Sequence, residues 1–199
     1  GPDALIENNY IHHILDSCGG AGCDGVGISF RTTVVINKNI VHHCINSGIA
    51  YFNDHPAGTN DIFITNNLVY DNTRTAIYIN TGCPESIPDS VHVYHNTVIS
   101  SPLQVQWQHD CPLGFNNYSG YKYTAGNILI YEGVFDTNQY IFNSSGALSN
   151  YYNIKAGSDI GFVNFNTRDL RLLASSSAVD YLPSGNILLA DDIQSKLRI

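Results

Sequence analysis

The segment VVINKNIVHHCINSGIAYF (34–52) decides the fold class of this chain. Apolar residues occupy nearly every second position, which predicts short β-strands with one buried face. Asn39 interrupts this pattern, although a single strand has no evident use for a polar amide at its centre. The amide would be explained if it recurred at a fixed period, because periodic self-similarity indicates a repeat architecture.

The same pattern, apolar-x-apolar-x-x-Asn-x-apolar, recurs along the chain. Its copies are ALIENNYIHH (4–13), VVINKNIVHH (34–43), IFITNNLVYD (62–71), VHVYHNTVIS (91–100) and, more weakly, YTAGNILIYE (123–132). The shared asparagines are Asn9, Asn39, Asn67, Asn96 and Asn127, which are separated by 30, 28, 29 and 31 residues. Each such period predicts one structural coil.

A second short strand is predicted in each coil, after the asparagine. The segments are GVGISF (25–30), GIAYF (48–52), AIYI (76–79) and LQVQW (103–107). Two sets of positions in them repeat every 28 residues: Ile49, Ile77 and Val105, and Tyr51, Ile79 and Trp107. This spacing places Trp107 in an inward column. Two features with one period, and no helical pattern between them, predict a solenoid.

Inward side chains of successive coils would form columns about 4.8 Å apart, the spacing of strands in a sheet. The expected columns are Ile6, Ile36, Ile64 and Val93, and Ile11, Val41, Val69 and Val98. The asparagines would form another column at a bend, where each amide can bond to the next coil and to the backbone of the turn. Asn39 is therefore interpreted as a corner of the coil.

The repeated I-x-x-N-x-[IV] and the later glycine-strand element, as in NSGIAYF (46–52), resemble the right-handed parallel β-helix proteins of the pectate-lyase-like superfamily. The tail FVNFNTRDLRLLASSSAVDYL (162–182) resembles the segment that often closes such helices. The resemblance implies an all-β, right-handed parallel β-helix of about five to six coils over residues 1–160, with a degenerate closing segment over 161–199. It also implies a secreted, carbohydrate-active protein whose partner is a polysaccharide.

Members of this superfamily commonly begin with further coils and a capping helix, whereas a full repeat starts here at Ala4. An uncapped end would expose apolar side chains and unpaired strand backbone. We therefore expect either missing coils or a packing partner at this end.

Charge and composition disfavour several classes of partner. Charged residues make up 13% of the chain, and the formal net charge is −8 with only nine Lys and Arg. Because there is no basic run, nucleic acid and anionic membrane surfaces are disfavoured. No apolar stretch is long enough to span a bilayer. The resemblance to secreted β-helix proteins implies a secreted or extracellular location.

Five cysteines without paired metal-ligand spacing favour disulfides in an oxidising compartment, with one thiol left over. We expect Cys18–Cys23 to close the first-coil loop, and Cys83–Cys111, 28 residues apart, to bridge adjacent coils. Cys44 is expected to be buried, unless it reaches Cys18. Two sequons, 117–119 and 143–145, are permissive for glycosylation.

The first candidate site follows the asparagine corner. The pairs His12-His13 and His42-His43 occupy equal positions in coils one and two, and Asp71 follows in coil three. His13, His43 and Asp71 would form one column with neighbours about 5 Å apart, close enough to share zinc, calcium or a proton. The alternative is that positions after the corner are simply polar.

The second candidate lies in the loops FNDHPAGTN (52–60) and WQHDCPLGF (107–115). Asp54-His55 and His109-Asp110 fall at nearly matching coil positions, with Asp24 alongside. Loops gathered on one side of a rigid solenoid form binding sites, and two carboxylates there could act as acid and base in glycoside hydrolysis. The alternative is that they are ordinary solvated loop residues.

Basic residues are the third candidate, because polysaccharide lyases of the resembled superfamily typically use Lys or Arg as base, with calcium or another cation neutralising the uronate. Arg31, Lys38 and Arg74 are the only basic residues in the first three coils, and Arg74 joins the candidate catalytic set. The alternative role is surface solubilisation. The acidic net charge disfavours a uronate groove unless calcium or another divalent metal intervenes.

Two classes of function follow. The first is a polysaccharide-cleaving enzyme, a lyase or a glycoside hydrolase, which the resemblance favours. The second is a non-catalytic β-helix module for carbohydrate binding, adhesion or surface structure. For either class, Tyr118, Tyr121 and Tyr123 alternate in NNYSGYKY (116–123) and are expected in an outward loop where sugar rings could stack.

Overall fold

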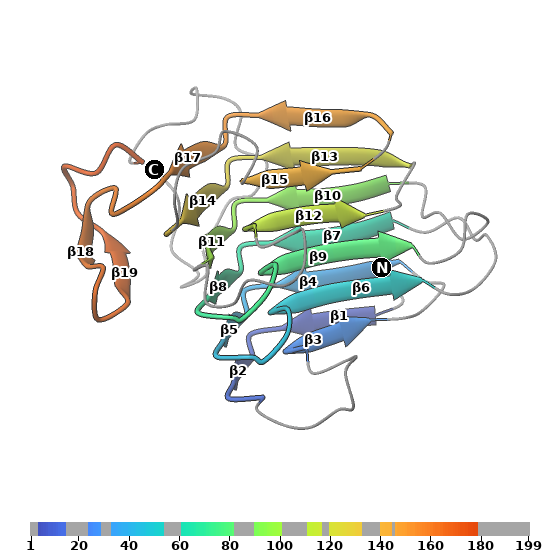
Figure 1. Ribbon diagram of the computed structural model, residues 1–199, viewed down its shortest axis with the longest axis horizontal. Coiled ribbons are helices and arrows are strands. Elements are labelled where there is room, and N and C mark those ends of the chain that lie inside the picture. The colour runs from blue at the N-terminus through green and yellow to red at the C-terminus, as the bar shows by residue number, and fades with distance from the viewer. Residues whose placement is uncertain are drawn as a thin grey trace.

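The computed structural model is a parallel β-helix with three sheets along its length (Figure 1). It describes residues 4–14, 24–28, 33–53, 61–81, 90–100, 111–116, 120–132, 140–144 and 146–178. Within these residues every element is a strand, and none is a helix long and apolar enough to cross a membrane. The all-β parallel solenoid predicted from the repeat is confirmed.

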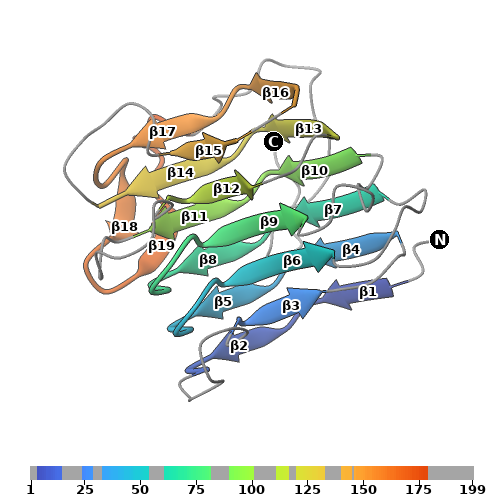
Figure 2. The same cartoon turned by 45° about the vertical axis from the view of Figure 1, so that its right-hand side comes forward.

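Each of the first five coils contributes one strand to each sheet, and the sixth contributes strands to sheets A and B. All neighbouring strands in the three sheets are parallel (Figure 2). Sheet A contains β1 (Ala4–Glu7), β4 (Val34–Asn37), β7 (Asp61–Thr65), β10 (Ser90–Tyr94), β13 (Tyr121–Ala125) and β16 (Leu148–Tyr151). Sheet B contains β2 (Tyr10–His12), β5 (Ile40–His42), β8 (Leu68–Tyr70), β11 (Thr97–Ser100), β14 (Ile128–Tyr131) and β17 (Ile154–Ala156). Sheet C contains β3 (Val26–Ile28), β6 (Ile49–Asn53), β9 (Ile77–Thr81), β12 (Leu113–Asn116) and β15 (Ile141–Asn143).

The inward columns are those predicted from the repeat. In sheet A, Ile36 pairs with Ile6 on one side and with Ile64 on the other, and Val93 continues the column. In sheet B, Val41 lies between Ile11 and Val69. Val98 follows Val69 in register, and all members from the second coil onward are fully buried. One continuous apolar core therefore runs along the axis.

The asparagine column is a hydrogen-bonded ladder. The Asn67 Oδ1 accepts hydrogen bonds from both the backbone N–H and the Nδ2 of Asn39, each at 3.0 Å. The Asn39 Nδ2 also donates to the backbone oxygen of Ile6 in the preceding coil, at 2.9 Å. The same arrangement joins the other members and continues one coil beyond the predicted repeat, to Asn153. The ladder spans all six strands of sheets A and B.

The residue before each ladder asparagine has left-handed backbone, which makes the bend between sheets A and B. Such residues are Asn8, Lys38, Asn66, His95, Gly126 and Tyr152, with φ from 51° to 64°. Gly adopts this conformation without strain, and Asn and His are enriched in it, so the ladder bonds must hold Lys38 and Tyr152 there. Lys38, a candidate basic residue, therefore occupies a turn position set by the backbone.

Glycines mark the entry into sheet C because the chain approaches the core closely there. A Cβ on Gly25 would lie 2.4 Å from Cγ1 of Val41, and one on Gly48 would lie 2.4 Å from Cγ1 of Val69. Any side chain would collide with the sheet B column. This contact explains the glycine in the second element of the repeat.

The fourth coil corrects one part of the predicted register. Ile77 pairs with Leu113 and Ile79 with Phe115, rather than with Val105 and Trp107. β11 ends at Ser100 and β12 begins at Leu113, whereas β8 and β9 are separated only by residues 71–76. Extra residues between β11 and β12 therefore interrupt the 28-residue period. Turns of a solenoid tolerate such insertions. Residues 103–107 lie outside the described residues.

The predicted Cys83–Cys111 disulfide is wrong for the same reason. Cys111 accepts the backbone N–H of Ala76 on its carbonyl oxygen, so it corresponds to Thr75 of the previous coil and not to Cys83. Cys111 and Cys44 are both reduced and buried, and burial raises the pKa of the Cys44 thiol to about 11. Burial of Cys44 is confirmed. Cys18, Cys23 and Cys83 lie outside the described residues.

A C-terminal hairpin folds back on the outer face of sheet B (Figure 1). It consists of β18 (Phe162–Asn164) and β19 (Asp169–Leu172), which are antiparallel. Phe162 forms a second apolar cluster with Ile99 and Ile130, which point outward from β11 and β14. In register, these isoleucines occupy the positions that His12 and His42 occupy in the first two coils. Sheet B therefore has apolar outward residues where the hairpin covers it and histidines in the first two coils.

Removal of an internal ladder amide should destabilise the coils. In Asn67→Ala, the buried N–H and Nδ2 of Asn39 lose their shared acceptor, so the free energy of unfolding should fall by about 2–4 kcal/mol. Asn9→Ala is the matched control, because Asn9 is exposed and should cost less than about 1 kcal/mol. Urea denaturation measures both. Equal losses would contradict the role given to the ladder.

One lysine points into the core. Lys122 on β13 is inward between Val91 and Leu148 in register, is 1% exposed, and has its Nζ 5.9 Å from the centroid of Phe115. Burial lowers the pKa of Lys122 from its usual 10.5 to about 8. The folded state therefore binds this proton less readily than the unfolded chain does.

Lys122→Met should stabilise the protein at pH 7, by up to about 3 kcal/mol for a pKa lowered to this extent. Between pH 8 and 10.5 the unfolded chain holds the Lys122 proton and the folded chain does not, so wild-type stability gains on the variant as pH rises. The difference in free energy of unfolding between the two proteins, measured from pH 7 to 10, should shrink. A difference independent of pH would contradict the lowered pKa.

Candidate functional site

The predicted histidine column exists on the edge of sheet B. The rings of His13 and His43 are stacked with centroids 4.9 Å apart. The backbone N–H of His43 donates to the backbone oxygen of Asp71 in the next coil. All three residues have left-handed backbone, with φ of 55°, 54° and 51°. Histidine and aspartate are among the residues enriched in this conformation, which gives a structural reason for their recurrence.

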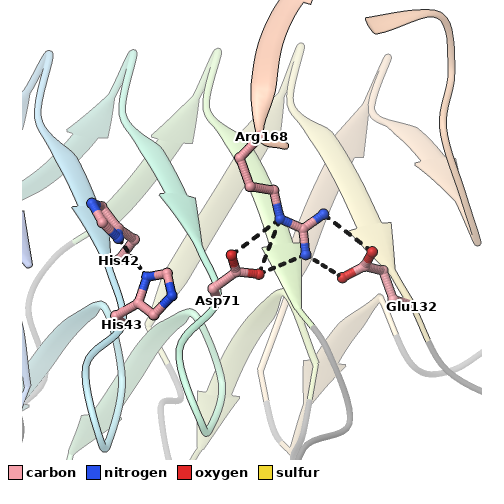
Figure 3. Close-up of polar contacts among 5 residues, drawn as sticks. All are labelled: His42, His43, Asp71, Glu132 and Arg168. Carbon is pink, nitrogen blue, oxygen red and sulfur yellow. Dashed lines mark hydrogen bonds and ion pairs between the residues drawn. The ribbon is translucent and has the colours of Figure 1, made fainter. Parts of the chain in front are cut away.

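The Asp71 carboxylate faces Arg168 of the C-terminal hairpin rather than the imidazoles (Figure 3). Arg168 Nη2 and Nε donate to Asp71 at 2.6 and 3.1 Å, and Nη1 and Nη2 donate to Glu132 at 3.1 and 2.8 Å. The guanidinium also lies 4.9 Å from the ring centroid of Phe165. Burial lowers the pKa of Arg168, but its two carboxylate partners outweigh this and raise it.

The predicted metal site at His13, His43 and Asp71 is not supported by this geometry. Both oxygens of Asp71 accept hydrogen bonds from Arg168. Across the described ranges, no group of three or more His, Cys, Asp or Glu is placed to hold a metal ion. Asp71 serves instead to attach the hairpin to the third coil.

The histidines of the first two coils form proton-sharing pairs. The Nδ1 atoms of His12 and His13 are 2.7 Å apart, and those of His42 and His43 are 2.6 Å apart. Two Nδ1–H groups cannot face each other, so each contact requires at least one neutral ring. Burial, and then the charges of the other imidazoles, lower the pKa of His42 to about 4. The His42 side chain is therefore uncharged at neutral pH.

Arg168→Ala should release the hairpin from sheet B without unfolding the coils. We expect amide hydrogen exchange in β18 and β19 to accelerate at least tenfold, because two partly buried carboxylates lose their shared cation. Arg171→Ala is the matched control, since within the described part of the chain Arg171 pairs only with Asp169, and its side chain is 66% exposed. Equal protection in wild type and Arg168→Ala would contradict an attachment role.

A second set of polar groups lies at the amino edge of sheet C, just before its strands begin. Asp24, which precedes β3, accepts hydrogen bonds on Oδ1 from Asn46 Nδ2 at 2.8 Å and from the Ser47 N–H at 3.0 Å. Burial raises the pKa of Asp24, an effect partly offset by these donors and by Arg74. The Ser47 side chain also acts to lower the pKa of this carboxyl.

Tyr78 extends this set onto the outer face of sheet C. Its ring packs over Gly114, where a Cβ would lie 3.2 Å from Cδ2 of Tyr78. Its hydroxyl accepts a hydrogen bond from Asn116 Nδ2 at 2.9 Å, and Phe52 contacts the ring edge-on with centroids 5.9 Å apart. The glycine thus leaves room for a ring held along the sheet.

Arg74 joins the two groups electrostatically. It precedes β9, is partly buried, and acts to lower the pKa of both Asp24 and Tyr78. Arg74 therefore links electrostatically a carboxyl whose pKa is raised and an aromatic ring on the outer face of sheet C. We name this set, Asp24, Arg74, Tyr78 and Asn116, the sheet C site. It could bind a ring and transfer a proton.

The structure does not place the predicted loop residues. Asp54, His55, His109 and Asp110 lie outside the described residues, as do Arg31, Trp107 and Tyr118. In chain order, Asp54 follows the end of β6, whereas Asp110 precedes the start of β12. The alignment of these two loops was therefore wrong, and convergence of the four side chains stays a prediction.

Of the candidates within the described residues, Arg74 and Asp24 both belong to the sheet C site, while the expected position of Asp24 beside Asp54-His55 and His109-Asp110 stays a prediction. The prediction missed Tyr78 and Asn116, because both lie on strand positions that read as ordinary outward residues. An alignment that placed Gly114 opposite Tyr78 would have indicated room for the tyrosine ring, and Asn116 two residues further on. Tyr121 and Tyr123 lie outward on β13, and not in a loop.

Comparison with known proteins gives no family for this chain. No protein-family model, curated protein or solved structure matches it.

Proposed function

We propose that this protein acts on a polysaccharide and that the sheet C site holds the glycan. The observation that carries the proposal is the Tyr78 ring held over Gly114, together with a partly buried arginine whose charge acts on both Tyr78 and Asp24. Aromatic rings flanked by a few fixed polar groups are a common way to hold a sugar ring. The resemblance of the repeat to secreted, carbohydrate-active β-helix proteins of the pectate-lyase-like superfamily supports the same proposal.

Asp24 is the proposed acid or base of the reaction. Burial raises the pKa of Asp24, and a carboxyl whose pKa is raised is a better proton donor to the leaving oxygen of a glycosidic bond. Arg74 would bind an anionic or hydroxyl oxygen of the sugar, and Tyr78 would hold the ring. Hydrolysis needs a second carboxylate, for which Asp54 and Asp110 are the sequence candidates. A lyase reaction would need a uronate that Arg74, or an added divalent metal, neutralises.

A non-catalytic β-helix module for carbohydrate binding, adhesion or surface structure is the second candidate. It is favoured by the outer face of sheet A, where Tyr121 and Tyr151 are 63% and 59% exposed. Exposed aromatic rings on a rigid sheet can bind glycans without any chemistry.

Asp24→Asn tests the catalytic proposal, because the amide can still accept the Ser47 and Asn46 hydrogen bonds but cannot transfer a proton. We expect the rate of glycan cleavage to fall roughly 100- to 10,000-fold. Reducing-end release and unsaturated product are measured on neutral and uronate glycans, with and without calcium or zinc. Asp169→Asn on the hairpin is the control and should retain full activity.

Cleavage by Asp24→Asn at the wild-type rate would refute the role of Asp24. A wild-type protein that cleaves no glycan in any of these conditions, yet binds one, would favour the non-catalytic module.

A further inference from the structure

The outer face of sheet A carries a column of stacked rings that the sheet C site does not use. Phe63, His92 and Tyr123 follow one another in register on β7, β10 and β13. Their ring centroids are 4.6 and 4.9 Å apart, with interplanar angles of 10° and 13°. Stacked rings of this kind support a parallel sheet, since their spacing matches that of the strands.

The central ring is fixed by a directed chain of hydrogen bonds. Ser90 Oγ donates its one proton to Asp61 Oδ1 at 2.6 Å, so His92 Nε2 must be the donor in its 2.6 Å contact with Ser90 Oγ. His92 Nδ1 is then an acceptor for the Tyr94 hydroxyl at 2.7 Å. In this tautomer His92 cannot take the Ser90 proton, so the chain holds a ring in place and is no nucleophilic dyad.

The column of rings stops at the sixth coil. Tyr123 pairs in register with Ser149 of β16, while Ala125 pairs with Tyr151. The rings of Tyr123 and Tyr151 thus lie diagonally opposite each other, and the small residues Ala125 and Ser149 take the other two corners of the patch. Within the described residues, the one ring stacked on Tyr123 is His92, and Tyr151 is 59% exposed. We name Tyr121, Tyr123, Ala125, Ser149 and Tyr151 the tyrosine cradle.

The geometry points to the tyrosine cradle as a binding site for one neutral pyranose ring of a glycan chain, seated over Ser149 and stacked on Tyr123. A sugar ring there would occupy the next position of the column, at the spacing that the three side-chain rings already keep. Because His92 is fixed on both nitrogens, the Tyr123 ring is held before the ligand arrives, which lowers the entropy cost of binding. Hydroxyl groups of Ser149, Tyr123 and Tyr151 can bond to the sugar.

Charge selects a neutral sugar over a uronate. On the described strands of sheet A, the outward-facing charged residues are Glu7 and Asp61, and both are acidic. The one lysine on these strands, Lys122, points inward and is buried. A sugar carboxylate would meet no cation among the described outward residues of this face and would be repelled at long range. This site does not rest on the catalytic proposal for sheet C.

Binding is tested by NMR titration and calorimetry with cellohexaose, xylohexaose, mannohexaose, chitohexaose and hexagalacturonate. The titrations use Asp24→Asn protein, so that cleavage does not consume the ligand. We expect at least one neutral oligosaccharide to bind and to shift the ring signals of Tyr123, whereas hexagalacturonate should not. Tyr123→Ala should weaken binding roughly tenfold or more, the loss of one ring contact.

Ser149→Phe separates binding from folding, because it places a side-chain ring where the sugar ring would sit. It should leave the melting temperature equal to or above that of the parent protein and still abolish binding. Tyr152→Ala is the matched control, since Tyr152 is an exposed tyrosine at the turn outside the cradle, and should bind as the parent does. Failure of every neutral oligosaccharide to bind, or binding unchanged in Ser149→Phe, would overturn the site.

Discussion

The amide–amide hydrogen bond between neighbouring asparagines is the interaction on which the rest of this structure depends. From the second coil onward, the Oδ1 of each ladder asparagine accepts hydrogen bonds from the backbone N–H and the Nδ2 of the asparagine one coil earlier. These bonds lie at the bend where each coil turns from sheet A to sheet B. Buried polar groups are tolerated only when they are bonded, and here each satisfies its neighbour. Fixed corners in turn set the register of all three sheets. Every column, apolar or aromatic, inherits its alignment from that register.

A regular backbone gives each outward column its own chemistry. Sheet B has histidine and tyrosine in the first coils and isoleucine where the hairpin covers it. Sheet A has stacked rings, and sheet C has small residues opposite Tyr78. Because the core is the same in each coil, outward positions are free to differ. The proposed glycan sites use this freedom on two different faces.

The core and the ladder could be predicted from sequence because both follow from local, periodic patterns. Alternation located the inward residues, and the recurring amide located the bend. Prediction failed where periodicity was broken, as in the fourth coil, where Phe115 and not Trp107 aligns with Ile79. Sequence gave no signal for Arg168, which is 97 residues from Asp71. The histidine pairs were correctly placed in columns, but their backbone conformation and neighbours point to packing rather than to a metal.

Arg168 has a consequence for how the coils come apart. In a simple solenoid each repeat interacts only with the repeats beside it, so ends can fray one unit at a time. Arg168 holds Asp71 of the third coil and Glu132 of the fifth with one side chain, and therefore couples units that are not adjacent. Fraying from the C-terminal end cannot pass the fifth coil until the contacts of Arg168 with Asp71 and Glu132 break. Coils three to five should then melt as one cooperative block rather than in single steps.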